Sequence, residues 1–245
     1  EPYRRQRQMC IRDSNLFNDL VLKNQQYLDI IASKDIYYNE TYYMGLVDKN
    51  NKINFYDGTL RVVDQKGNEK FKFHPNDYLD YIGEHVEPWS YEKFCFMKKI
   101  GWNGFTDGPE SGIYRCAPLA RMNASTGFTT PLAQQAYENM FGTFRDLGVE
   151  GPIHNTMAYH WARVIELMHA SELLLDLSQD PSITNKDIKA PAGEPGEGIG
   201  CIEAPRGVLI HHYVADEDGI TTDVNLVVGL SLIHISEPTR RVVIS

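Results

Sequence analysis

Apolar residues follow helical spacing in two parts of the chain. They recur three and four positions apart over residues 15–31, and again over 157–177, where the apolar stripe is too wide for a helix on the surface. Thr130 followed by Pro131 is typical of a helix start, because threonine can cap free N–H groups and proline suits the first turn. We therefore expect a helical core over about 130–178.

Other segments show the residue types and turn signals of β-strands. Residues 37–73 are rich in tyrosine, phenylalanine, isoleucine and valine and are interrupted by three turn sequences, which predicts a meander of three or four short antiparallel strands. Residues 208–214 and 222–228 are also β-like and flank the turn sequence 216–219. The chain is therefore predicted to be α+β.

The remaining segments give weaker patterns. Residues 78–85 are predicted to form a short helix, and 89–128 an ordered loop rich in aromatic residues and glycine. Residues 186–200 hold four glycines and two prolines, which argues against regular structure there.

Charge and hydropathy narrow the class of protein. The 245 residues carry 33 acidic and 24 basic side chains, a formal net charge of −9. Nucleic-acid binding draws its affinity from clustered lysine and arginine, so nucleic acid is not an expected partner. No apolar stretch reaches the roughly 18 to 20 residues that cross a bilayer, and no secretory signal opens the chain, so we expect no membrane span and a cytoplasmic location.

The two ends of the chain are related to each other through their coding DNA. Residues 230–235 (LSLIHI) can be encoded by a DNA whose reverse complement encodes Met-Cys-Ile-Arg-Asp, the residues at 9–13. This pattern resembles a translated transposon end of the kind used to build sequencing libraries. We therefore expect residues 1–14 and 230–245 to be artefacts. The alternative is a basic N-terminal arm and a short final strand.

Removing these ends makes the chain more acidic and leaves few cysteines. The two ends hold six basic and three acidic side chains, so the interior, 15–229, has 18 basic and 30 acidic side chains and a net charge of −12. It keeps Cys95, Cys116 and Cys201, none of which lies in a C-x-x-C pair. Isolated cysteines of this kind usually act as small apolar residues.

Several polar residues are candidates for chemistry. The sharpest feature is the segment 203–207 (EAPRG), in which proline and glycine would hold the Arg206 guanidinium at a defined place. Arg115, Arg121 and Arg206 could together form an anion site. His160, Arg163 and Glu166 are spaced to form a polar ladder along the second helix, and the adjacent His211 and His212 would point to opposite faces of a strand.

Four segments, taken in order and approximate spacing, resemble the large subunit of nickel-iron hydrogenases. The resemblance extends over the whole interior and is greatest to the bidirectional, NAD-linked cytoplasmic branch. Two shorter segments, 85–89 and 211–213, support it. The four segments are 112–115 (GIYR), 117–123 (APLARMN), 159–166 (YHWARVIE) and 203–207 (EAPRG).

The resemblance implies a metal centre that this sequence does not supply in full. In the family a nickel and an iron, the iron carrying carbon monoxide and cyanide, are held by thiolates from two C-x-x-C pairs. Neither pair is present, and Cys95, Cys116 and Cys201 do not replace them, so we expect no metal ligand and no bound metal in this chain.

What the resemblance assigns to this chain is the surroundings of the metals. It implies that Arg206 lies above the metals, hydrogen-bonds a cyanide and acts as the catalytic residue, with Ala204 and Pro205 walling the pocket and Leu209 packing against the diatomic ligands. Since a guanidinium has a pKa above about 12, an electrostatic role for Arg206 is favoured over a role as base. The predicted site is this arginine loop, 202–209.

The implied activity is reversible heterolytic oxidation of dihydrogen to protons and electrons, with the electrons passed through an iron-sulfur small subunit to flavin-containing diaphorase subunits that reduce NAD. The chain is then an internal, inactive fragment of that large subunit, incomplete at both ends. The alternative is a self-contained acidic binding or scaffold module without metal.

Overall fold

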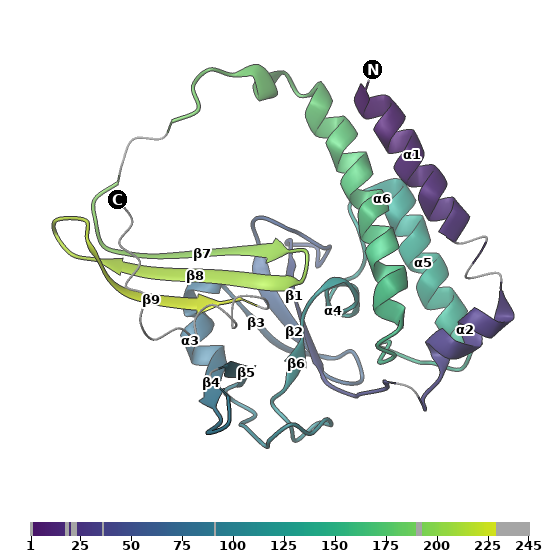
Figure 1. Ribbon diagram of the computed structural model, residues 1–245, viewed down its shortest axis with the longest axis horizontal. Coiled ribbons are helices and arrows are strands. Elements are labelled where there is room, and N and C mark those ends of the chain that lie inside the picture. Colours follow the sequence, from purple (N-terminus) through teal and green to yellow (C-terminus); the bar gives the residue numbers. More distant parts are fainter. Residues whose placement is uncertain are drawn as a thin grey trace.

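The protein has helices on one side and β-sheet on the other, as the sequence predicted for an α+β chain (Figure 1). Helix α4 (Pro118–Asn123) and the four-stranded sheet described below lie between the helices and the outer three-stranded sheet. The structure, a computed structural model, describes residues 2–17, 20, 24–35, 37–90, 92–189 and 193–228.

The helical part is built around α6, which contacts three other helices. α1, α4 and α5 all pack against it, and its buried face includes Trp161, Ala162 and Ile165. This confirms the predicted helical core. The helices are α1 (Pro2–Phe17), α2 (Gln25–Ala32), α5 (Pro131–Asp146) and α6 (Ala158–Gln179), with the short η3 (Pro181–Thr184) after α6.

The single helix predicted over 15–31 is wrong. α1 ends at Phe17, and α2 begins after Asn24, whose side chain accepts a hydrogen bond from the backbone N–H of Gln26. This N-cap starts a new helix that the apolar spacing alone did not indicate. The expectation that 1–14 is an artefact stays a prediction, and 230–245 lies outside the described residues.

The predicted meander is confirmed as three antiparallel strands, β1 (Tyr42–Val47), β2 (Thr59–Val63) and β3 (Glu69–Phe73). β1 is central and buried throughout. Its other edge pairs in parallel with β6 (Tyr114–Arg115), which gives the order β3-β2-β1-β6.

The segment after the meander departs from the prediction. The helix predicted over 78–85 is wrong in its second half: η2 (Pro75–Asp77) and α3 (Tyr78–Tyr81) are followed by strand β4 (Ile82–Val86). β4 pairs with β5 (Lys93–Met97) inside the segment expected to be loop. Aromatic contacts stabilise this ribbon, since the His85 ring stacks on Trp102 with centroids 4.5 Å apart.

The third sheet contains one strand that the sequence did not predict. β8 (Gly207–Ala215) and β9 (Thr221–Val227) match the expected β-like segments, but β7 (Glu197–Ala204) begins inside the glycine-rich segment. Gly198 and Gly200 lie opposite Tyr213 and His211 of β8. Both glycines pair with β8 although the space beside them is open, so the ladder of β8, rather than packing at these positions, makes the segment a strand.

The start of α5 is capped from α6 rather than by its own threonine. The Thr130 hydroxyl hydrogen-bonds Nδ1 of His169 (2.8 Å) instead of the helix backbone. The buried Glu172 carboxylate accepts hydrogen bonds from the backbone N–H groups of Leu132 (3.1 Å) and Ala133 (3.0 Å). A carboxylate here satisfies free donors and matches the positive end of the helix dipole.

Replacing this cap should destabilise the helical core. Glu172→Ala removes the acceptor of two N–H groups, so we expect the free energy of unfolding to fall by about 1–3 kcal/mol. Urea unfolding measures it, with the exposed Glu150→Ala as the matched control. Equal stability of the two variants would contradict the capping role.

Candidate functional site

The predicted arginine loop is a tight β-hairpin turn between β7 and β8. Ala204 pairs with Gly207, which leaves Pro205 and Arg206 as the two turn residues. Gly207 has a φ of +134°, and a Cβ built on it would lie 2.5 Å from Cβ of Cys116. Only glycine fits this position, where the turn rests directly on the chain between β6 and α4.

The turn brings all four predicted site residues to one small pocket. The pocket has a volume of about 70 Å³ and exposes mostly apolar surface. Leu209 and Ala204 are partly buried there, whereas Pro205 and Arg206 are exposed. The lining residues are Ala204, Pro205, Arg206, Gly207, Val208, Leu209 and Val228.

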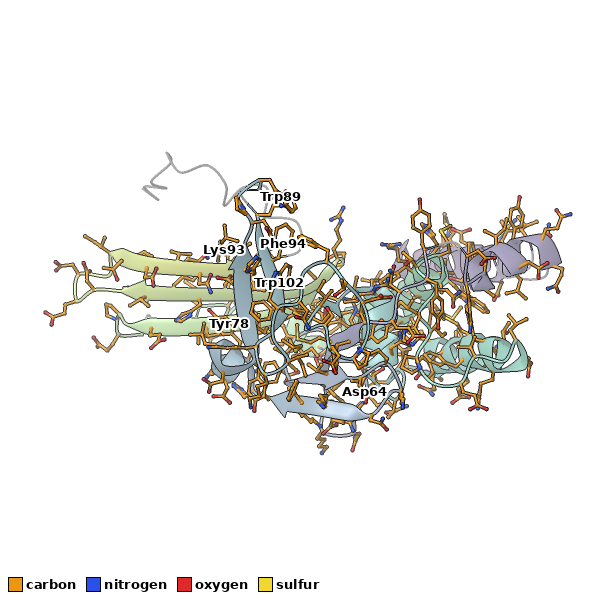
Figure 2. The ribbon with its side chains drawn as sticks, turned by 90° about the horizontal axis from the view of Figure 1, so that it is seen from below. Asp64, Tyr78, Trp89, Lys93, Phe94 and Trp102 are labelled. Atoms are coloured by element: carbon orange, nitrogen blue, oxygen red, sulfur yellow. The ribbon has the colours of Figure 1, made fainter. Side chains whose placement is uncertain are left out.

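Arg206 also borders a second, larger pocket of about 260 Å³ on the side of the β4–β5 ribbon. Aromatic rings from β5 and the following loop make one wall, including Phe94, Trp102 and Phe105. Figure 2 shows Phe94 and Trp102 close to Trp89 at the same end of the ribbon. Val227 of β9 also lines this pocket, so the pocket lies between the three-stranded sheet and the β4–β5 ribbon.

Directly beneath the turn lies a buried cluster of three charged side chains. Arg121 of α4, 1% exposed, forms one ion pair with Glu166 of α6 through two hydrogen bonds, from Nε to Oε1 (2.6 Å) and from Nη2 to Oε2 (2.8 Å). Its Nη1 donates to Oε2 of Glu203 of β7 (2.7 Å). The fully buried Glu203 also accepts the backbone N–H of Leu46 through Oε1 (2.9 Å).

This cluster corrects two sequence predictions. The anion site of Arg115, Arg121 and Arg206 is wrong, because Arg121 is bound to two carboxylates and Arg115 donates to the His154 carbonyl (3.1 Å) and to Asn39.

The ladder of His160, Arg163 and Glu166 is also wrong. Glu166 pairs with Arg121, and the Arg163 guanidinium lies 5.9 Å from the centroid of the Tyr159 ring. The sequence did contain one signal for the cluster, a glutamate directly before the Ala-Pro-Arg turn.

Burial controls the protonation of the cluster. Hydrogen bonds and charge from Glu166 and Glu203 raise the pKa of Arg121 despite its burial, so it stays charged. Burial raises the pKa of Glu203 to about 7, although Arg121 and the Leu46 N–H oppose the shift. One guanidinium thus neutralises only one of the two carboxylates, and ionising the second carboxylate in the low-dielectric interior costs free energy.

The cysteines near the turn, Cys95, Cys116 and Cys201, are free thiols. Burial raises the pKa of Cys95 to about 11 and that of Cys201 to about 12, and it raises the pKa of Cys116 further. Metal coordination requires thiolates. Among the residues that the structure describes, no three His, Cys, Asp or Glu side chains gather where they could hold a metal ion. The described residues therefore do not by themselves offer a metal-ligand set.

The two adjacent histidines point to opposite faces of β8, as predicted. Nδ1 of the buried His212 lies 3.0 Å from the Tyr78 hydroxyl, and its Nε2 lies 2.9 Å from Oε1 of Glu197. His211, on the other face, lies 3.1 Å from the Tyr213 hydroxyl. Both histidines therefore make hydrogen-bond contacts within the protein, which is consistent with a structural role.

Comparison with known proteins gives sequence relatives that are all components of hydrogenases. No family model matches the chain. It is 49% identical over 220 residues to an iron-sulfur subunit of the F420-non-reducing hydrogenase of Archaeoglobus profundus, covering 89% of this chain and 44% of that protein. It is 40% identical over 190 residues to the beta subunit of the NAD-reducing hydrogenase HoxS of Cupriavidus necator, covering 76% of this chain and 36% of the relative.

Solved structures agree with the sequence relatives. An NAD+-reducing NiFe-hydrogenase in the H2-reduced state matches with a TM-score of 0.77 and 32% identity, over 91% of this chain and 46% of that one. A NiFeSe-hydrogenase from Dm. baculatum shares the fold at 20% identity, with a TM-score of 0.58.

The fold and these relatives define a subunit of a hydrogenase. More specifically, the chain belongs to the nickel-iron hydrogenase large-subunit family. It spans under half the length of the relatives it matches. None of the helices in the described ranges is both long and apolar enough to cross a bilayer.

The raised pKa of Glu203 predicts a specific pH dependence of stability. Between about pH 4.5 and pH 7 the folded chain keeps a proton on Glu203 that the unfolded chain loses, so this group lowers stability as pH rises and its effect levels off above pH 7. Glutamine does not ionise, so in Glu203→Gln this fall in stability with rising pH is absent. The difference in free energy of unfolding, variant minus wild type, should therefore grow across this window.

Urea unfolding at several pH values measures this difference. The exposed Glu150→Gln serves as control and should follow the wild-type profile. Parallel profiles for wild type and Glu203→Gln would contradict a protonated Glu203 in the folded chain.

Proposed function

We propose that this chain is part of the catalytic large subunit of a nickel-iron hydrogenase, which oxidises dihydrogen reversibly and heterolytically to protons and electrons. The observation that carries the proposal is that Ala204, Pro205, Arg206 and Leu209 line one small apolar pocket. The membership of the chain in the large-subunit family supports it, and favours an enzyme over a self-contained binding module.

Arg206 is the catalytic residue in this proposal. It is exposed at the tip of a turn, with its donors free to face a ligand in the pocket. A guanidinium presents a planar fork of N–H donors, which suits an anionic ligand such as a cyanide on iron. Ala204, Pro205 and Leu209 supply apolar walls on one side of that hydrogen bond, which would strengthen it where the rest of the large subunit excludes water.

The nickel-iron centre with its carbon monoxide and cyanide ligands would supply the splitting of dihydrogen. The centre needs a set of thiolates, and among the described residues no three possible metal ligands gather. In the proposal these thiolates belong to other parts of the large subunit, and the chain alone is inactive.

The partners of the complete enzyme follow from the same proposal. An iron-sulfur small subunit would accept the electrons. Flavin-containing diaphorase subunits that reduce NAD are the proposed acceptor, in a cytoplasmic complex. This part draws support from the NAD-reducing relative of Cupriavidus necator, whereas the relative from Archaeoglobus profundus is named F420-non-reducing and leaves another acceptor as the alternative.

The test is Arg206→Lys in a complete large subunit that contains this segment, assembled with its small subunit. Lysine keeps the charge but lacks the planar fork, so we expect dihydrogen oxidation to fall by about a hundredfold or more with the nickel content unchanged. Arg163→Lys, an exposed change on α6, should leave activity unchanged. Near-normal activity of Arg206→Lys would show that the turn is misassigned.

A further inference from the structure

The turn that presents Arg206 does not have the backbone conformation that two-residue hairpin turns prefer. Two-residue hairpin turns prefer backbone conformations with positive φ at the first turn residue, because these match the twist of the strands. Pro205 stands at that position, and its ring fixes φ near −65°. Arg206 does not take a positive φ either, and the left-handed conformation falls on Gly207. The turn is therefore neither type I′ nor type II′, the two types that best match the twist of the flanking strands.

Contacts from outside the hairpin hold the turn in place. Nη1 of Arg121 donates to the carbonyl oxygen of Ala204 (3.0 Å), and Nη2 donates to that of Pro205 (3.4 Å). The same guanidinium thus binds two successive carbonyl groups, one just before and one inside the turn. Charge-assisted hydrogen bonds of this kind are stronger than those between neutral groups.

The guanidinium itself has little freedom to move. Glu166 binds it through both carboxylate oxygens, and Glu203, directly before the turn, binds Nη1. Behind it, Cα of Arg121 packs so closely on Gly45 that a Cβ there would lie 3.0 Å away. The position of Arg121 is therefore set by α4, α6 and β1, with Glu203 of β7 as a further partner.

We propose that Arg121 is a positioning residue, which fixes the Pro205–Arg206 turn and through it the place of the Arg206 guanidinium. Because α4 carries it and Glu166 of α6 binds it, Arg121 holds the carbonyl groups of Ala204 and Pro205 at a fixed place relative to the helical core. Its relevance to dihydrogen chemistry rests on the proposed function, whereas its hold on the turn is a property of this chain alone.

The test uses the full chain and two variants. Arg121→Lys keeps a charge but can reach fewer acceptors. Arg121→Met with Glu203→Gln removes the guanidinium together with the fully buried carboxylate, and the carboxylate that remains, Glu166, keeps 13% of its side chain exposed to solvent. The control is Arg115→Lys, an arginine whose donors bind the His154 carbonyl and Asn39 instead of the turn.

Amide hydrogen exchange, followed by NMR, is compared between the turn (204–207) and the middle of β7 (198–202). We expect exchange at the turn to rise about tenfold or more in the double variant and less in Arg121→Lys, with β7 unchanged. The side-chain Nε–H signal of Arg206 should shift in both variants and stay in place in Arg115→Lys.

Two results would overturn the proposal. One is unchanged exchange at the turn and an unchanged Arg206 signal in the double variant. The other is a rise of the same size throughout β7 and β8, which would mean general destabilisation. If the turn loosens as expected but Arg206→Lys keeps full activity in the assembled enzyme, the positioning role stands and the proposed function fails.

Discussion

The structure depends on one guanidinium buried between two carboxylates. Arg121 joins α4 to α6 through Glu166 and to β7 through Glu203, so it connects the helical side of the molecule to the three-stranded sheet. A buried ion cluster adds little net stability, because desolvation offsets much of the attraction, but removing one member leaves an uncompensated charge. Its contribution is therefore to fix how the elements meet, at positions where apolar packing would allow several arrangements.

The site follows from this connection and from close packing around it. A hairpin with proline in its turn is stable here because its carbonyl groups have fixed donors and its glycine rests on Cys116. The apolar pocket walls and the raised pKa values of the nearby thiols have the same origin, since burial excludes water from this region. The exposed Arg206 guanidinium thus projects from a turn whose base is buried and held by fixed contacts.

Periodicity and turn residues predicted α5, α6, the meander and β8–β9, because each follows from local sequence. β7 was missed because its glycines disfavour a strand locally, whereas the backbone partners that make it one lie on β8. The arginine cluster was missed for the same reason at longer range: Arg121 and Glu203 are 82 residues apart. The segment 203–207 was found, with Arg206 at its tip, because proline and glycine mark a turn from sequence alone.

Arg206 lines both the small pocket beside Leu209 and the large aromatic pocket beside Phe94, as do Gly207, Val208 and Val228. The Arg206 guanidinium therefore borders two spaces at once. A group in the aromatic space that hydrogen-bonds it would leave fewer of its N–H donors for the small pocket, so the occupants of the two spaces would draw on one set of donors.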